Sequence, residues 1–190
     1  LLGRPLVRRV LLIDFAYWFA FAVFQATFAL FVANRFGFDA AQTGYLFAAF
    51  GLLGVIVQVA FIRPIVHRLG DKTTLLAGLI LSATGLLAAS QAQSVVMFVL
   101  ALLPLALGMG FGTPAVTSLV SRAGGKDEQG RMQGAAGAVE SLGRTVGPVW
   151  GTVSLQQVGP SMPYVSAAAL LMVTLLLSLG YRVTDPPQSA

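Results

Sequence analysis

The sequence predicts an all-α membrane protein built as a bundle of six transmembrane helices. Three observations predict it: an apolar composition, six long apolar runs, and short connections between them. Of the 190 residues, 56% are hydrophobic and only 10% are charged, whereas a soluble domain averages about 25% charged residues. The mean hydropathy is +0.81. A soluble chain of this length could not cover so much apolar surface, so we expect most of the chain to be embedded in lipid.

A transmembrane helix needs roughly 20 apolar residues, and six segments meet that requirement. They cover residues 10–33, 44–66, 73–90, 95–121, 131–155 and 163–181. The first run is longer than the core of a signal peptide, which has about 7–15 apolar residues, and we interpret it as a span. The connections are too short to hold a soluble domain. Residues 1–190 are therefore expected to form one transmembrane domain.

The residue content excludes several kinds of site. The chain has no cysteine and one histidine, His67, so disulfides, thiolate sites and the common zinc motifs are not expected. No nucleotide-binding loop of the form G-x-x-x-x-G-K-[ST] occurs. We expect no metal, no cofactor and no enzymatic activity.

Lysine and arginine predict the orientation, because cytoplasmic loops of membrane proteins are enriched in both. The net charge is +5, yet the basic residues lie at the ends of apolar runs rather than on one face. That placement favours a membrane protein over a nucleic-acid partner. One predicted side holds Arg4, Arg8, Arg9, Arg63, Arg68, Lys72, Arg122, Lys126, Arg131 and Arg182, and the other holds Arg35. Both termini are expected in the cytoplasm, with the chain in a bacterial inner membrane.

Glu140 and Arg144 are the strongest candidates for function. They lie four residues apart, on one face of a helix, and can pair. Counted from Arg131 at about 1.5 Å per residue, they lie roughly 13 and 20 Å into the membrane. Such residues avoid lipid and face a bundle interior or an aqueous cavity. They form either a structural ion pair or part of a transport pathway.

Asp14 and Gln25 are the polar candidates of the first span. Asp14 follows Arg8 and Arg9 closely, so it is either an interfacial carboxylate paired with an arginine or a proton or substrate site. Gln25 lies near the middle of the span, where an amide needs a partner. It either hydrogen-bonds to a neighbouring helix or faces a pathway.

Small residues and prolines mark two helices. The fourth span contains Gly108, Gly110, Gly112 and Pro114, and the fifth contains Gly143, Gly147, Pro148 and Gly151. Glycine lets helices approach closely in lipid, and proline kinks a helix. We expect the first group to form either a bend used in alternating access or a close helix crossing. The second group predicts a small-residue stripe with a kink.

These motifs resemble the C-terminal half of a Major Facilitator Superfamily transporter. Residues 143–151, GRTVGPVWG, have the G-x-x-x-G-P-x-x-G form typical of drug–proton antiporters, placed on the helix that would be the eleventh. Residues 63–72, RPIVHRLGDK, resemble the family's cytoplasmic motif G-x-x-x-D-R-x-G-R-K. Arg68, Gly70 and Lys72 match it, and Asp71 stands where the family has a basic residue. The run PAVTSLVSRAGGKDEQGRMQG resembles the junction of the tenth and eleventh helices.

The resemblance implies two inverted three-helix repeats that form one half of a transporter. The partner would be an N-terminal six-helix half or a second copy of the chain. The chain starts LLGRPLVRR without an initiator methionine, as a segment following a central loop would. The implied function is secondary transport of a small organic solute, such as multidrug efflux by proton antiport, with Glu140 as the proton-coupling acid and Arg144 tuning it. A membrane scaffold, or a half-size protein acting as a homodimer, is the alternative.

Overall fold

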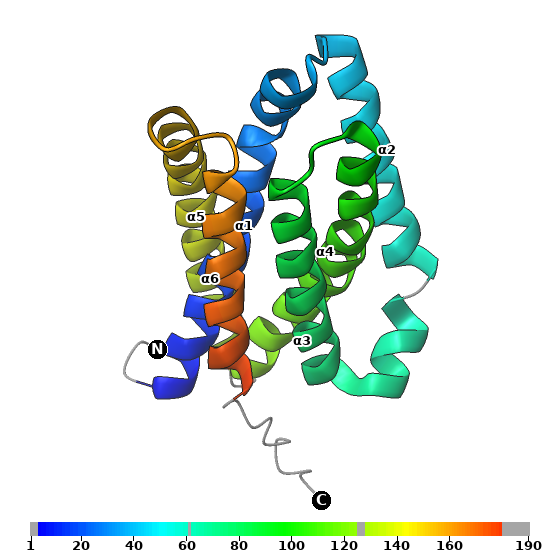
Figure 1. Ribbon diagram of the computed structural model, residues 1–190. Coiled ribbons are helices and arrows are strands. Elements are labelled where there is room, and N and C mark those ends of the chain that lie inside the picture. The colour runs from blue at the N-terminus through cyan, green and yellow to red at the C-terminus, as the bar shows by residue number, and fades with distance from the viewer. Residues whose placement is uncertain (1–3, 61, 125–127, 180–190) are drawn as a thin grey trace, which may run out of the picture.

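The computed structural model describes residues 4–60, 62–124 and 128–179. Six helices account for most of them: α1 Pro5–Phe36, α2 Ala40–Ala60, α3 Ile62–Ser90, α4 Val95–Ala123, α5 Gln129–Gln157 and α6 Met162–Leu179 (Figure 1). Lys126, Arg182 and the last two residues of the predicted sixth span lie outside this described part. The chain is an all-α bundle, as its sequence predicts.

Local signals set the ends of these helices. Pro5 occupies the first turn of α1, where its missing N–H costs nothing. α1 ends at Gly37, whose φ of 68° is left-handed and whose N–H bonds back to Ala33. α4 begins after Ser94, whose side chain accepts a hydrogen bond from the Met97 N–H at 3.2 Å. α1, Pro5–Phe36, extends beyond the predicted span 10–33 at both ends, because the signals that start and stop the helix lie outside its apolar run.

The structure differs from the prediction between the second and third spans. The expected span 44–66 corresponds to α2, which ends at Ala60, and to the start of α3 at Ile62, and residue 61 lies outside the described part. Residues 67–72, expected to form a connecting turn, belong to α3, which is kinked at Gly70 with φ 76° and ψ 162°. A residue without Cβ adopts these angles readily. The apolar pattern did not indicate that the helix begins before residue 73, because residues 67–72 are largely polar.

Five helical segments among the described residues are long and apolar enough to cross a membrane. They are α1, α2, Arg68–Ser90 in α3, α4 and α6. α5 is as long as α4, at 29 residues, but it carries Arg131, Glu140 and Arg144 among many small residues. The helix that is least suited to lipid is thus the one that holds the predicted functional pair.

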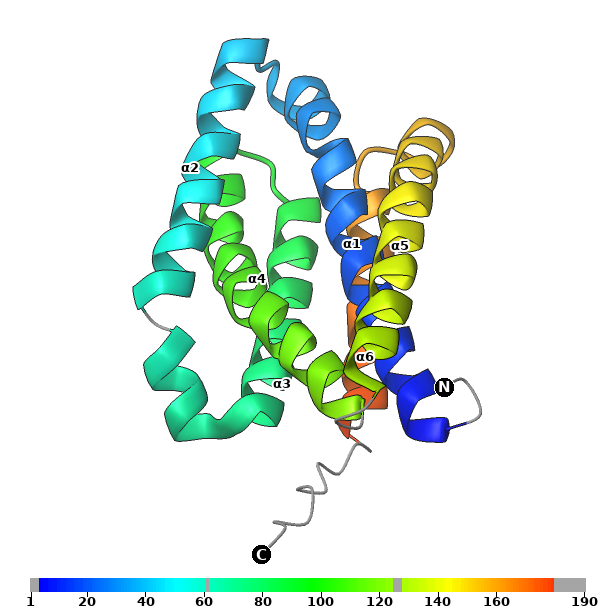
Figure 2. The same ribbon diagram turned by 180° about the vertical axis from the view of Figure 1, so that it is seen from behind.

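The six helices form two inverted repeats. The first three helices, α1 to α3, correspond in order to the last three, α4 to α6. Each helix contact has a counterpart under this correspondence: the contact of α1 with α5 matches that of α4 with α2, and the contact of α3 with α4 matches that of α6 with α1. Members of each corresponding pair run in opposite directions, as Figures 1 and 2 show for α1 and α4. This arrangement agrees with the inverted repeats expected from the sequence.

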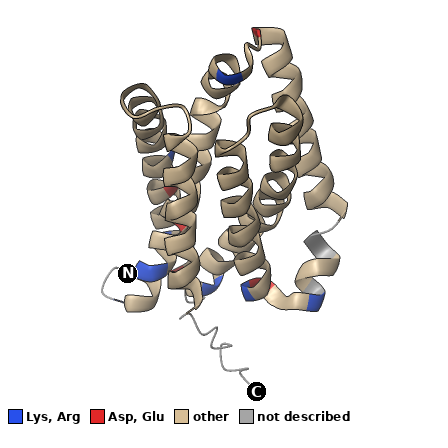
Figure 3. Ribbon diagram, in the orientation of Figure 1, with Lys and Arg blue, Asp and Glu red and all other residues tan. Residues whose placement is uncertain are grey.

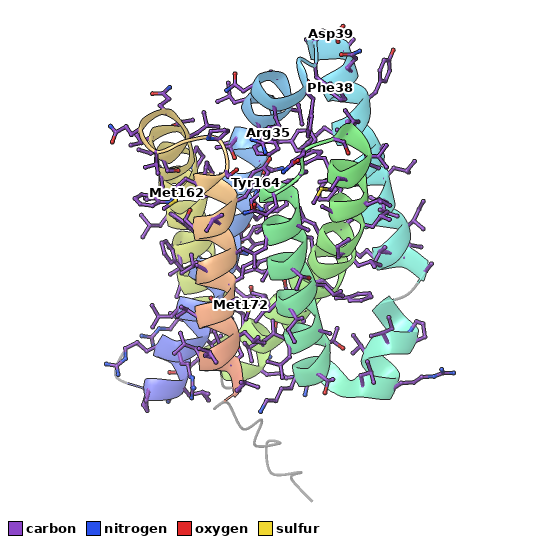
Figure 4. The ribbon with its side chains drawn as sticks, in the orientation of Figure 1. Arg35, Phe38, Asp39, Met162, Tyr164 and Met172 are labelled. Atoms are coloured by element: carbon purple, nitrogen blue, oxygen red, sulfur yellow. The ribbon has the colours of Figure 1, made fainter. Side chains whose placement is uncertain are left out.

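The two ends of the bundle differ in charge. Lysine and arginine gather at the end where α1 begins and α6 finishes (Figure 3). We call this the basic end; its described residues are Arg4, Arg8, Arg9, Arg68, Lys72, Arg122 and Arg131. The opposite end holds Arg35, whose Nε donates to the Ala92 carbonyl at 3.1 Å. Figure 4 shows Arg35, Phe38 and Asp39 together at that end.

An aromatic cluster fills the core near the opposite end. Phe31 on α1 stacks on Tyr164 of α6 at 4.7 Å between ring centroids and on Phe98 of α4 at 5.3 Å. All three side chains are at most 1% exposed. The cluster ties the first helix of one repeat to two helices of the other, so it stabilises the packing of the two repeats.

Candidate functional site

The stripe of small residues on α5 packs directly on α1. A Cβ added to Gly143 would lie 3.0 Å from the Phe19 nitrogen, and one added to Gly147 would lie 2.8 Å from the Ala22 Cβ. A Cβ added to Gly151 would lie 2.9 Å from Thr27 Cγ2. The glycines therefore allow the two backbones to approach closely. α5 continues as one helix through Pro148, so the motif acts here as a close helix contact.

This contact sets the register of the site. Each step of four residues along α5 is matched by a step of about four along α1, so the two helices run parallel. Continuing the register toward the basic end places Glu140 level with Asp14, and Arg144 level with Trp18. Two acids, one base and one indole thus meet where α1 crosses α5.

Glu140 and Arg144 form the ion pair expected from their spacing. Arg144 Nη2 lies 2.8 Å from Glu140 Oε1. The Arg144 guanidinium carbon also lies 4.1 Å from the centre of the Trp18 ring, which is within the range of a cation–π contact. The two side chains are 48% and 33% exposed in this chain. Arg144 is therefore held both by a carboxylate on its own helix and by an aromatic face on α1.

Asp14 is buried in the same place without a cation of its own. Its side chain is 3% exposed, and Oδ2 has no hydrogen-bond partner among the described residues. The carboxyl lies within electrostatic reach of Glu140. None of the ion pairs in the described part of the chain includes Asp14. The interfacial pairing with Arg8 or Arg9, one interpretation of the sequence, is therefore not the arrangement in this structure.

Gln25 lies on the same stripe of α1 as Asp14, but about 16 Å further along the helix at about 1.5 Å per residue. It is exposed and lines a groove of about 520 Å³ between α1 and α2, together with Phe28, Phe47 and Asp39. The structure thus separates Gln25 from the charged cluster. Its expected role in a pathway stays a prediction.

The glycines of α4 face three different helices. A Cβ on Gly108 would clash with Ser82 of α3, one on Gly110 would lie 2.7 Å from Val57 of α2, and one on Gly112 would lie 2.7 Å from Tyr17 of α1. The sequence suggested either a bend or a close helix crossing here, and these distances are those of close crossings. α4 continues as one helix past Pro114. A bending role stays a prediction.

The predicted loop motif joins α3 to its neighbours at the basic end. Asp71 Oδ2 pairs with Arg122 Nη2 of α4 at 2.5 Å, and Lys72 Nζ donates to the Leu179 carbonyl of α6 at 3.2 Å. Gly70 provides the kink that turns α3 into this position. Arg68 is exposed. Asp71, which stands where the family motif has a basic residue, therefore links α3 to α4.

Sequence reasoning missed two residues of this region. Neither Trp18 nor Tyr17 is among the predicted site residues, yet Trp18 contacts Arg144 of α5 and Tyr17 hydrogen-bonds to α4. The Tyr17 hydroxyl bonds to Thr113 Oγ1 at 2.8 Å and to the Met109 carbonyl at 3.2 Å. The spacing of Trp18 four residues after Asp14 was an available signal, because such pairs share a helix face.

A bundle of apolar helices arranged as two inverted repeats defines an integral multi-pass membrane protein. Residues 10–190 match the family described as the Major Facilitator Superfamily. The chain belongs to this family.

Individual relatives point the same way. The chain is 27% identical over 164 residues to Multidrug resistance protein 1 of Bacillus subtilis, covering 86% of this chain and 42% of the relative. It is 30% identical over 147 residues to the class C Tetracycline resistance protein of Escherichia coli, covering 77% and 37%. The crystal structure of the human organic anion transporter MFSD10 superposes with a TM-score of 0.84 at 24% identity, covering 90% of this chain and 40% of that one. The chain thus spans less than half the length of these proteins.

Proposed function

We propose that the chain is the C-terminal half of a secondary transporter that moves a small organic solute by alternating access, coupled to protons. The observation that carries the proposal is the Glu140–Arg144 ion pair beside the buried carboxyl of Asp14. Ionisable groups at this depth are costly in a membrane and commonly mark substrate or proton pathways. The names of the bacterial relatives, which refer to multidrug and tetracycline resistance, support efflux as the direction.

The partner we propose is a six-helix N-terminal half, with a second copy of the chain as the alternative. Val57 is the only buried residue of α2 among its described side chains, so this helix lacks a covering layer. Arg144 is half exposed as well. A second half placed over α2 and α5 would cover both. The native product would then run at about twice the 19.9 kDa of this chain, which an immunoblot measures directly; a band near the mass of the chain would favour the homodimer.

We further propose that the basic end faces the cytoplasm, as in a bacterial inner membrane. Ten of the 12 lysines and arginines were assigned to this side from the sequence, and the described ones gather at one end (Figure 3). The positive-inside bias supports this orientation.

Solute exchange in proteoliposomes tests the transport proposal against the scaffold alternative. The native product would be reconstituted and loaded with ethidium or tetracycline as probes. Substitution of the pair by Glu140→Gln with Arg144→Gln is expected to abolish probe exchange while leaving the size-exclusion profile unchanged. Glu128→Gln, which alters an exposed pair with Arg4 at the basic end, is the matched control. Absence of exchange by the unmodified protein would favour the scaffold.

A further inference from the structure

The cluster at the α1–α5 crossing is unbalanced in charge. With all groups ionised, Asp14 and Glu140 contribute two negative charges and Arg144 one positive charge. Unpaired charge in the membrane interior is costly, so the three groups reach neutrality by binding a single proton. One of the two carboxyls must therefore hold it.

The geometry distinguishes the two carboxyls. Glu140 lies 2.8 Å from Arg144, so its negative charge is balanced. Asp14 is 3% exposed and its Oδ2 has no partner among the described residues. A charge-assisted hydrogen bond favours the ionised form of its acceptor, and this favours a proton on Asp14 rather than on Glu140.

Trp18 holds Arg144 through its aromatic face. The centre of its ring lies 4.1 Å from the Arg144 guanidinium carbon, and Trp18 follows Asp14 by four residues, on the same face of α1. Edge-to-face contacts with Tyr17 at 5.6 Å and Phe21 at 5.7 Å hold the ring in place. The indole therefore holds the cation in the position where it pairs with Glu140.

Other charged groups near α1 do not alter this balance. On α1 itself, Arg8 and Arg9 lie toward the basic end and Arg35 lies at the opposite end. On α4, Arg122 is paired with Asp71 at the basic end. α2 carries no charged side chain, and neither does the described part of α6. Arg131 at the start of α5 pairs with Glu128 at 3.7 Å.

We propose that Asp14, Trp18, Glu140 and Arg144 form a one-proton site, in which Trp18 holds Arg144 on Glu140 and Asp14 carries the exchangeable proton. This inference rests on the proposed function and assigns its proton to a residue. Trp18 is a positioning residue: it acts through Arg144. The proton moves between Asp14 Oδ2 and water, and no other bond changes.

Infrared spectroscopy of the purified native product tests the assignment, because only a protonated carboxyl shows the carboxylic acid C=O band. Asp14→Asn is expected to remove one band from the pH-difference spectrum. Replacing the ion pair as a unit, by Glu140→Gln with Arg144→Gln, is expected to keep it. Asp39→Asn is the control, since Asp39 is an exposed helix cap whose Oδ1 accepts from the Gln42 N–H.

The role of Trp18 gives a second readout. Trp18→Leu removes the aromatic face and frees Arg144 to approach Asp14, so the band should weaken at a fixed pH. Trp18→Phe keeps an aromatic face for Arg144 and should restore most of the band. A side chain needed only for packing would leave the band equally strong in both variants, and that result would overturn the positioning role.

Survival of the band in Asp14→Asn, with its loss in the double variant, would assign the proton to Glu140 and overturn the inference. If Asp14→Asn does not fold, loss of the band in the double variant alone overturns it. Probe exchange measured on the same preparations separates this from the proposed function. A wild-type protein that holds the Asp14 proton but moves no probe leaves the inference standing and contradicts only the transport proposal.

Discussion

Gly112 on α4 leaves the space that the ring of Tyr17 on α1 occupies. A Cβ at Gly112 would lie 2.7 Å from Tyr17 Cε2, and the ring reaches past it to bond Thr113 Oγ1 at 2.8 Å. This contact joins α1 to α4, the first helices of the two inverted repeats. Tyr17 is also the neighbour of Trp18 in the sequence.

Gly112→Ala should therefore destabilise the bundle. Overpacking a well-packed site costs about 1–3 kcal/mol, and here the added methyl group would push Tyr17 away from Thr113. Thermal unfolding in detergent measures the effect as a lower Tm. Gly54→Ala on α2 is the control, because a Cβ there meets nothing within 4 Å. Equal Tm values for the two variants would show that Tyr17 gives way freely.

The α1–α5 contact makes a similar prediction at Gly147. A methyl group at this position would meet the Phe19 carbonyl at 3.0 Å and the Val23 nitrogen at 3.2 Å. Backbone atoms cannot move aside as the end of a flexible side chain can. We therefore expect Gly147→Ala to lower the free energy of unfolding by about 1–3 kcal/mol. Gly137→Ala on the same helix has open space around its Cβ and should be neutral or slightly stabilising, because alanine is the better helix former. Loss of stability in Gly137→Ala but not in Gly147→Ala would contradict the register.

The Asp71–Arg122 bridge should contribute little to stability. Arg122 is 52% exposed and Asp71 21%, and exposed ion pairs contribute about 0–1 kcal/mol. A double-mutant cycle with Asp71→Asn and Arg122→Gln should give a coupling energy in that range, and salt should reduce it further. A coupling energy well above it, unchanged by salt, would mean that the bridge is shielded from water in the assembled protein.

The orientation can be tested because the chain contains no cysteine. Single cysteines at Gly130, near the basic end, and at Gln91, near the opposite end, both occupy exposed positions. In intact cells with an otherwise cysteine-free background, a membrane-impermeant maleimide should label Gln91→Cys and spare Gly130→Cys. The reverse pattern would place the basic end outside.

The sequence predicted the fold well because its signals are strong in lipid. Apolar runs identify helices when the solvent is hydrocarbon, and the i to i+4 spacing correctly paired Glu140 with Arg144. It missed that residues 67–72 belong to α3, because these residues are largely polar and only Gly70 marks the kink. The burial of Asp14 and the polar contacts of Trp18 depend on which face of α1 meets α5. That relationship arises from the glycine contacts between two helices far apart in the sequence, which periodicity within one helix does not reveal.

Solute accumulation driven by a pH gradient tests the central claim most directly. Proteoliposomes that hold the native product and are acid inside should accumulate tetracycline as protons leave. Collapse of the gradient with nigericin, or the Glu140→Gln substitution, which removes the acid that balances Arg144, should abolish the accumulation. Accumulation that persists unchanged in Glu140→Gln, or that ignores the gradient in the wild-type protein, would contradict proton coupling through this cluster.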